Sequence, residues 1–355
     1  MIFTKELMKM QNGQPVCSLS DWEKRRLEIL DILAKNAYGY LPTDEVRAEM
    51  TITETIKKCC SGHAVLYNVS FCMTSAKGSY SIPAHFFIPK GTGKHPLVIL
   101  LNFRPDTYDM YYPAEEIIDN GLAILSVCHE NIQLDEQPDY RQGLGSILTP
   151  PDSPYRYGQI SIWAFAASRM MDCVRQLDEI DAENIAIAGA SRLGKTALWC
   201  GANDTRFRFV FSNGAGCMGD ALNQIKHKGS EPISSIKRSF PSWFCPNFQS
   251  FEKEEDLPYD QHWLMACIAP RFVCIGSAQD DLWADPESQQ LTCIGASAAW
   301  QLYGLEGYGE PKEMLKPNTR STGGQIGFHY RDGIHFLGRP DWLHFMDFMN
   351  ANLKK

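Results

Sequence analysis

Ser191 lies in a segment, residues 185–199, whose residue types suit two kinds of chemistry. The letters GASRLGKT at residues 189–196 match G-x-x-x-x-G-K-[ST], a loop whose backbone N–H groups bind phosphate. The shorter stretch GASRLG places a serine between an apolar strand and a helix, close to the G-x-S-x-G turn that presents a nucleophile. One pattern predicts a nucleotide-binding protein, whereas the other predicts an ester hydrolase.

The neighbouring residues disfavour nucleotide binding. Small residues usually fill the middle of a phosphate loop, but Arg192 and Leu193 are bulky. The next predicted strand ends at Asn213, where a magnesium-binding aspartate would be needed. A second match, GAGCMG at residues 214–219, fits G-x-G-x-x-G. A polar segment follows it instead of the second strand that a dinucleotide site requires, so we expect neither nucleotide site.

The hydrolase interpretation requires an acid and a histidine later in the chain, and both are present. Asp280 and Asp281 come just after an apolar strand that ends at Ile275. His335 lies in a Gly-Ile-His segment near the C-terminus. The order Ser191, acid, histidine is that of serine hydrolases built on a parallel sheet. The sequence therefore predicts a catalytic triad, with either aspartate as the acid.

Elements that would position these residues follow from the hydrophobic pattern. Continuous apolar runs predict strands buried on both faces, and i, i+3, i+4, i+7 spacing predicts a long amphipathic helix at residues 160–177. The predicted buried strands are residues 96–103, 122–127, 185–188, 207–212 and 272–275. Alternating strands and helices indicate an α/β fold, a three-layer sandwich with a mostly parallel sheet and helices on both faces. We expect one domain over residues 1–355, with antiparallel strands at residues 46–90.

The first 45 residues are expected to form a helical segment packed on this domain. Ser20 and Glu23 fit a capping box, and Gly39 and Pro42 would end the helix. Its predicted apolar face consists of Leu27, Leu30 and Ala34.

Composition excludes several other classes of protein. The net charge of −8 argues against nucleic acid and anionic membranes as partners. No apolar run approaches the ~18 residues of a membrane-spanning helix. Twelve scattered cysteines and the lack of a visible signal peptide predict a cytoplasmic protein, or a secreted one if a leader has been removed. No cysteine spacing indicates a metal site, and we expect neither a metal nor a cofactor.

Taken together, four segments resemble the glucuronoyl esterases, carbohydrate esterases of the α/β-hydrolase superfamily, and particularly their bacterial branch. The segments are GASRLGKTALW at 189–199, LPYDQHWLMACIAPR at 257–271, SAQDDLWADP at 277–286 and GIH at 333–335. The resemblance implies hydrolysis of glucuronic or 4-O-methylglucuronic acid esters, as in links between lignin and carbohydrate. An esterase for acetyl or other small acyl groups is the alternative.

The resemblance also implies roles for individual residues. Ser191 would be the nucleophile, His335 the general base, and Arg192 a donor to the oxyanion. The residues implied to bind the sugar are Lys195, Trp283 and Glu231.

The chain departs from some relatives at the position of the acid. In those proteins the acid follows the strand after the serine helix, where this chain has Asn213. The resemblance then favours Asp281, two residues before Trp283, with Asp280 as the second choice.

Overall fold

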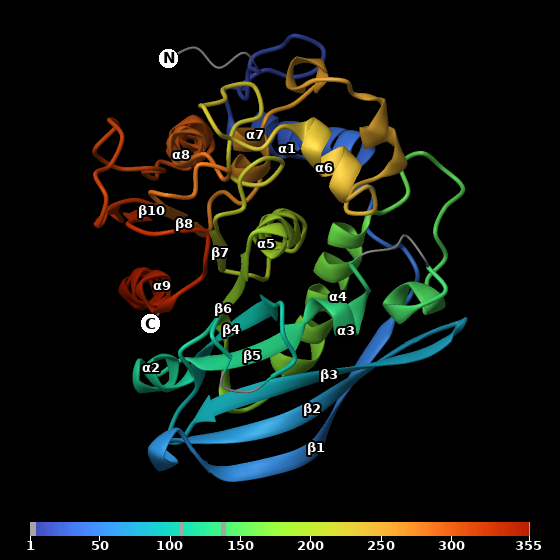
Figure 1. The fold of residues 1–355 in the computed structure, drawn as a ribbon, viewed down its shortest axis with the longest axis vertical. Helices are drawn as coiled ribbons and strands as arrows, with labels where there is room; N and C mark the ends of the chain where they lie inside the picture. The colour runs from blue at the N-terminus through green and yellow to red at the C-terminus, as the bar shows by residue number, and fades with distance from the viewer. Residues whose placement is uncertain (1–4, 107–108, 136–139, 355) are drawn as a thin grey trace.

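The computed structural model describes residues 5–106, 109–135 and 140–354. Within them, ten strands form one sheet in the order β1-β2-β3-β5-β4-β6-β7-β8-β10-β9 (Figure 1). The strands are β1 (Arg47–Cys59), β2 (Ala64–Ser75), β3 (Gly78–Pro89), β4 (His95–Asn102), β5 (Ala123–Cys128), β6 (Ile180–Ala190), β7 (Phe209–Asn213), β8 (Phe272–Ala278), β9 (Thr319–Ser321) and β10 (Ile326–Arg331). All the strands predicted from the sequence are present.

Strand direction divides the sheet into two parts. Six neighbouring strands of the sheet pair in parallel, and their order is β5-β4-β6-β7-β8-β10. An antiparallel meander of β1, β2 and β3 extends the sheet at one edge, and the short β9 closes the other. The carboxyl ends of the parallel strands lie at one edge, where α/β folds place their binding sites.

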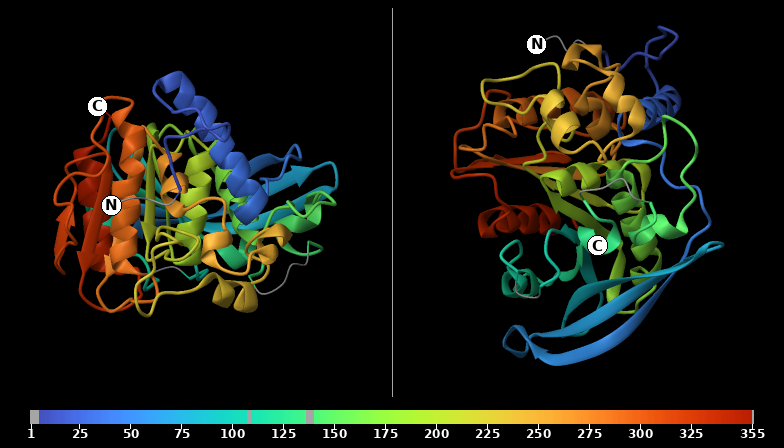
Figure 2. Two further views of the ribbon diagram at one scale, coloured as in Figure 1. Left: turned by 90° about the horizontal axis from the view of Figure 1, so that it is seen from above. Right: turned by 45° about the vertical axis from the view of Figure 1, so that its right-hand side comes forward.

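Helices cover both faces of the parallel part, which confirms the predicted three-layer sandwich (Figures 1 and 2). The helices are α1 (Leu19–Leu33), α2 (Ala114–Asp119), α3 (His129–Ile132), α4 (Gln159–Val174), α5 (Arg192–Asn203), α6 (Ile233–Ser239), α7 (Gln261–Ala266), α8 (Pro286–Gln301) and α9 (Arg339–Ala351). In the part of the chain described, none of them is both long and apolar enough to cross a membrane.

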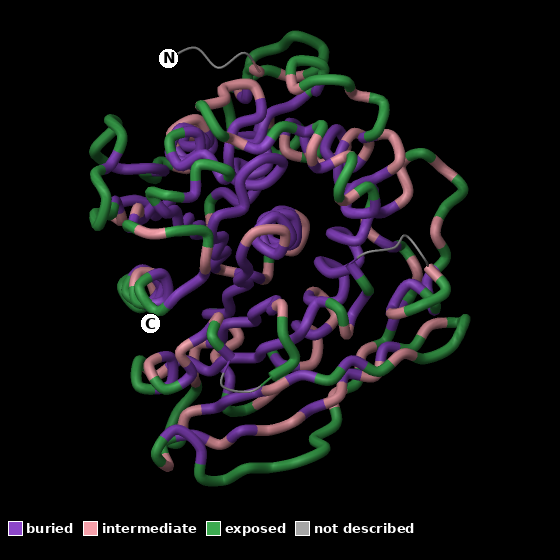
Figure 3. Tube along the Cα trace, viewed as in Figure 1, coloured by how far each residue is buried: buried purple, intermediate pink, exposed green. Residues whose placement is uncertain are grey.

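Two apolar clusters, one on each face, hold the layers together. The larger cluster joins the sheet to α1, α4, α5, α7 and α8, and the smaller joins it to α2 and α9. Strand β4 contributes Leu97, Ile99 and Leu101 to the first cluster, and Val98 and Leu100 to the second. This alternation is the period of two that a strand buried on both faces requires, and Figure 3 shows the buried centre of the sheet.

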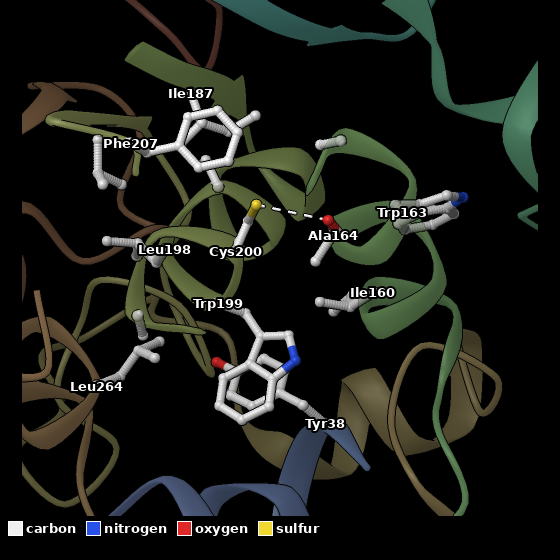
Figure 4. Packing of buried hydrophobic residues seen from close by; sticks show 14 of the residues in the cluster. Tyr38, Ile160, Trp163, Ala164, Ile187, Leu198, Trp199, Cys200, Phe207 and Leu264 are labelled. Atoms are coloured by element: carbon white, nitrogen blue, oxygen red, sulfur yellow. Dashed lines mark hydrogen bonds between the residues drawn. The ribbon is translucent and has the colours of Figure 1, made fainter. Parts of the chain in front are cut away.

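Helices α4 and α5 pack closely behind the strand that precedes Ser191. Trp199 stacks on Tyr38 with ring centroids 4.6 Å apart (Figure 4). Its indole N–H donates to Ser161 Oγ at 2.9 Å. Cys200 lies beside them, with its thiol on the Ala164 carbonyl. Because Trp199 and Cys200 are buried and hydrogen-bonded in this packing, α5 has little freedom to move.

The N-terminal helix differs from its prediction. Its cap is Ser18, whose side chain accepts from the Asp21 N–H at 3.1 Å while Asp21 accepts from the Ser18 N–H, so the predicted Ser20–Glu23 box was wrong. Leu27, which was predicted to lie on the apolar face of this helix, is exposed. The buried residues of α1 are Trp22, Arg25, Ile29, Ile32 and Leu33. The helix continues as a π turn over Ala34–Tyr38 before Gly39, which has φ 77°.

Candidate active site

Ser191 occupies a sharp turn between β6 and α5. It is the one residue between the strand and the helix, and its φ of 54° and ψ of −125° are unusual for a residue with a side chain. Its N–H donates to the Asn213 carbonyl at 2.8 Å, which fastens the turn to the neighbouring strand β7. This geometry projects the hydroxyl from the carboxyl end of the sheet, as a nucleophile elbow does.

The two glycines around Ser191 are explained by packing within the turn. A Cβ on Gly189 would lie 2.2 Å from the Leu193 carbonyl oxygen, and one on Gly194 would lie 2.8 Å from Ser212 Oγ. Both distances are too short for a side chain, so both positions require glycine. With a single residue between strand and helix, the turn has no loop long enough to surround a phosphate. The match to the phosphate-binding pattern therefore arises from the requirements of an elbow.

His335 and Asp281 meet beside this turn. His335 Nδ1 lies 2.5 Å from Asp281 Oδ2, and the other carboxylate oxygen accepts from the Ala284 N–H at 3.3 Å. Asp281 is buried, whereas 46% of the His335 side chain is exposed. Asp280 is exposed, and its N–H bonds the Gly333 carbonyl. The structure thus brings Asp281 rather than Asp280 to the histidine.

A cleft of about 510 Å³ opens in front of these groups. Both Ser191 and His335 line it. Much of its wall is apolar, formed by Phe103, Met110, Tyr111, Phe336 and Leu337. Tyr111 stacks on Phe336 with centroids 5.1 Å apart and contacts Phe103 at 5.3 Å with the rings tilted by 49°, so the wall is a continuous aromatic surface.

Arg192 is held by a carboxylate and a ring that sequence reasoning missed. Its guanidinium donates through Nη1 to Asp135 Oδ2 and lies 4.6 Å from the ring centroid of Trp243. The Trp243 indole N–H donates to the other Asp135 oxygen at 2.5 Å. No local pattern marks Asp135 or Trp243, because they are 108 residues apart and meet only in the fold.

Arg192 also lines a second cavity, of about 570 Å³. It shares Phe103 and Arg192 with the first cleft. Its remaining lining is mainly polar, with His129, Glu130, Asp135, Ser239, Phe240, Pro241 and Ser242. His129 is buried, its Nδ1 faces the Asn102 carbonyl at 3.2 Å, and its Nε2 lies 3.6 Å from Asp135 Oδ2. Sequence reasoning identified none of these polar residues.

The three residues implied to bind sugar are placed differently from one another. The backbone of Glu231 donates to the Trp283 carbonyl at 3.0 Å, which brings these two together. Half of Trp283 is exposed, whereas Glu231 is buried. Lys195 is buried, and its Nζ donates to the Ala215 carbonyl. Burial lowers the pKa of Lys195, and the Glu231 carboxylate opposes that shift.

The glycine-rich stretch at residues 214–219 passes close to Asp281 and His335. A Cβ on Gly214, whose φ is 55°, would lie 3.2 Å from both Asp281 Oδ2 and His335 Nδ1. One on Gly216 would lie 2.9 Å from the Ala284 Cα. The segment that follows contains no strand before α6, as the sequence predicted. These glycines therefore allow a loop to pass close to the His–Asp pair, and the dinucleotide pattern is incidental.

Comparisons with known proteins agree with this geometry. Residues 72–304 match the family model described as glucuronyl esterase, fungi. A carbohydrate esterase from an unknown prokaryotic organism is 41% identical, over 97% of this chain and 88% of that protein. A 4-O-methyl-glucuronoyl methylesterase of Schizophyllum commune is 25% identical, over 83% of this chain and 72% of that protein.

Solved structures give the same result. The glucuronoyl esterase from Solibacter usitatus has a TM-score of 0.88 and 25% identity, covering 99% of this chain and 98% of that one. A promiscuous esterase of carbohydrate esterase family 15 from a marine bacterial metagenome has a TM-score of 0.87 and 28% identity, with the same coverage. The elbow, the His–Asp pair and these matches together show that the chain belongs to the glucuronyl esterase family.

Proposed function

We propose that this enzyme hydrolyses esters of glucuronic or 4-O-methylglucuronic acid, as in lignin–carbohydrate linkages, through an acyl-enzyme on Ser191. The observation that carries the proposal is the Asp281–His335 contact of 2.5 Å at the cleft that Ser191 also lines. Family membership supports the substrate class, since the curated relatives include 4-O-methyl-glucuronoyl methylesterases.

The proton transfers follow from the histidine contact. With its Nδ1–H donated to Asp281, the neutral His335 ring carries its lone pair on Nε2. In the proposed reaction Nε2 takes the Ser191 proton as the oxygen attacks the ester carbonyl, and later gives it to the departing alcohol. Water then enters by the same route and releases the acid. Asp281 stabilises the imidazolium that forms in each half of the reaction.

The oxyanion that forms on the carbonyl requires N–H donors. The Arg192 backbone N–H lies in the first turn of α5, where N–H groups have no partner within the helix. The Arg192 guanidinium lines the cleft and is held in place by Asp135 and Trp243. A donor of this kind contributes about 2.7–4 kcal/mol to transition-state stabilisation. We therefore assign Arg192 to the oxyanion, through one or both of these groups.

The two cavities beside Arg192 suit the two halves of an ester. Phe103, Tyr111 and Phe336 give the first an aromatic wall, which suits an apolar alcohol such as a benzylic one. The second is lined by carboxylates and hydroxyls, which suit the hydroxyls of a sugar. Its volume of about 570 Å³ also leaves room for sugar residues attached to the glucuronate. We therefore include oligosaccharide esters among the proposed substrates.

Glu231, Trp283 and Lys195 are assigned to the sugar side of this site. Burial lowers the pKa of Arg192, and the Glu130 and Glu231 carboxylates oppose that shift, so both acids interact with the guanidinium. Lys195 Nζ uses one of its three N–H groups on the Ala215 carbonyl and retains two for other acceptors. The exposed Trp283 ring offers a surface for stacking on a pyranose.

The proposal is tested with two substrates on the wild-type enzyme. Benzyl glucuronate should give a much higher kcat/KM than 4-nitrophenyl acetate, because binding energy from the sugar helps to position the ester. Faster cleavage of the acetate would instead assign the protein to the acetylesterases. Failure to cleave either ester would contradict a hydrolase function altogether.

A variant of Lys195 tests the sugar assignment separately. Lys195→Met keeps the length of the side chain but removes its donors, and we expect about a ten- to hundredfold lower kcat/KM on benzyl glucuronate. Hydrolysis of 4-nitrophenyl acetate by the same variant serves as the control and should change little. An equal loss on both substrates would show that Lys195 supports the fold of the site rather than sugar binding.

We also propose that the enzyme acts in the cytoplasm. In the described residues, the cysteines form no disulfide, and most of them are buried. Such thiols persist in a reducing compartment, whereas secreted proteins commonly oxidise theirs to disulfides. Fractionation of the native host, followed by detection of the protein and titration of its thiols, tests this location; recovery outside the cell would contradict it.

A further inference from the structure

We propose that Arg331, at the end of β10, is a positioning residue for His335 and works only when it is anchored by Asp341. The loop that carries His335 wraps around the guanidinium. Nη1 donates to the Asp332 carbonyl at 2.8 Å, and Nη2 donates to the carbonyls of Ile334 at 3.2 Å and Phe336 at 2.5 Å. The last two residues flank His335, so the arginine holds the backbone on both sides of the base.

Asp341, in the first turn of α9, fixes the guanidinium itself. Arg331 Nε lies 2.9 Å and 3.0 Å from the two Asp341 oxygens. The same fully buried carboxylate contacts His329 Nε2 at 2.9 Å and accepts from the Gly338 N–H at 2.8 Å. Burial alone would raise the pKa of Asp341, but the contact with His329 and the Arg331 charge outweigh it and hold that pKa below its usual range. The anchor is therefore a carboxylate at neutral pH.

The acid of the proposed triad is attached to the same strand end. The Gln279 N–H donates to the Arg331 carbonyl at 2.8 Å, and the Asp280 N–H donates to the Gly333 carbonyl at 2.9 Å. These bonds hold the loop that leads into Asp281. Because the base loop and the acid loop share one support, the Arg331 network determines how His335 and Asp281 meet.

Asn213 adds a third connection. Its side-chain N–H donates to the Phe336 carbonyl at 3.3 Å, and its own carbonyl accepts from the Ser191 N–H at 2.8 Å. The nucleophile turn and the histidine loop are therefore joined through one residue of β7. Asn213 therefore links two loops in this chain. It does so at the position where, by the family resemblance, some related proteins have the triad acid.

The geometry requires a guanidinium in particular. Five N–H groups in a rigid plane allow Arg331 to bind three carbonyls and a carboxylate at once, which the single ammonium of lysine cannot do. Gly333 permits the close wrapping, since its φ is 85° and a Cβ there would lie 3.3 Å from Arg331 Nη1. Loss of the arginine should leave the imidazole present but displaced, and a displacement of about 1 Å costs about a hundredfold in rate.

The test compares Arg331→Lys with a matched control, Arg206→Lys. Arg206 also binds two carboxylates, Asp204 and Asp172, and a backbone carbonyl, but it does not line the catalytic cleft. We expect Arg331→Lys to lower kcat at least about tenfold, with KM within about threefold, while Arg206→Lys keeps its kcat. Thermal unfolding of both variants gives the fraction of folded enzyme to which the rates are normalised.

A spectroscopic measurement separates positioning from stability. The wild-type His335 Nδ1 proton, in a 2.5 Å contact with Asp281, should give a low-field proton NMR signal that weakens or moves in Arg331→Lys and is unchanged in Arg206→Lys. If Arg331→Lys does not fold, Gly333→Ala displaces the loop from the same guanidinium and should give the same loss of kcat. An unchanged kcat and proton signal in a folded variant would overturn the proposal, as would an equal loss in the control.

The inference rests on the proposed Ser–His–Asp mechanism, but it does not depend on the choice of ester. The rates are therefore measured with 4-nitrophenyl acetate as well as benzyl glucuronate. Wild-type enzyme inactive on both esters would contradict the proposed function. An active wild-type enzyme with a fully active Arg331→Lys variant would contradict only the positioning role.

Discussion

Replacing Asp281 by asparagine should remove most of the activity while leaving the fold intact. Asparagine has nearly the same shape as aspartate, so its Oδ1 can still accept from the Ala284 N–H, as Asp281 does at 3.3 Å. What the change removes is the negative charge 2.5 Å from His335 Nδ1. The proposed mechanism needs that charge because the imidazole becomes positive in the transition state.

The size of the effect follows from the contact. Two unit charges about 4 Å apart attract by about 4 kcal/mol at an effective dielectric constant of about 20, which suits a buried carboxylate beside a half-exposed ring. At about 1.4 kcal/mol per factor of ten, that loss lowers kcat about a thousandfold. The asparagine amide also offers an N–H to Nδ1, which favours the wrong tautomer of His335, so the total approaches about ten-thousandfold.

The assay is kcat/KM on benzyl glucuronate for Asp281→Asn and for Asp280→Asn as the matched control. Asp280 is adjacent and exposed, and it contacts the histidine loop through its backbone, so its substitution should change the rate less than about tenfold. A residual activity of Asp281→Asn within tenfold of the wild type would refute the reasoning. A larger loss in Asp280→Asn would show that the acid is misassigned.

Two further predictions concern the nucleophile and stability. Ser191→Ala should lower ester turnover by more than about a thousandfold without changing the thermal unfolding midpoint greatly, and turnover within tenfold would exclude it as nucleophile. Burial lowers the pKa of His262 to about 4 from its ordinary 6.5. Between pH 6.5 and 4 the unfolded chain therefore binds a proton at this residue that the folded chain does not. As the pH falls through this range, the free energy of unfolding should decrease by about 1.4 kcal/mol per pH unit. Urea unfolding should show a smaller pH slope in His262→Gln, and equal slopes would contradict the assignment.

The amino-acid sequence alone was sufficient for the parallel sheet and for the main residues of the candidate site. A strand buried on both faces must be apolar at every position, so β4 and β5 were visible as continuous runs. Ser191 was visible because an elbow needs glycines at short fixed spacing, and Asp280 and Asp281 because they follow an apolar strand, whereas the strand before His335 was not predicted. The single domain over residues 1–355 stays a prediction, as do the catalytic roles.

Local patterns misled the prediction of α1, because two starting residues and two apolar faces fitted the sequence equally well. Ser18 and Ser20 both precede acidic residues three positions later, and only burial of Trp22 and Ile29 against the rest of the protein selects the face that α1 turns inward. Leu27 is apolar but exposed, because its position on the helix lies away from the core. A periodicity of 3.6 gives the spacing of an apolar face but does not say which of two overlapping faces finds a partner.

The residues that hold the site in shape were decided by the tertiary structure. Asp135 reaches Arg192 and Trp243 across 57 and 108 residues of chain, and Asn213 reaches the His335 loop across 123. Lys195 follows the serine by one helical turn, yet its Nζ turns to the Ala215 carbonyl because β7 and its loop pack against α5. Such contacts depend on which strands become neighbours in the sheet. Strand order is set by the sum of many long-range packing energies, so no spacing within a few residues can encode it.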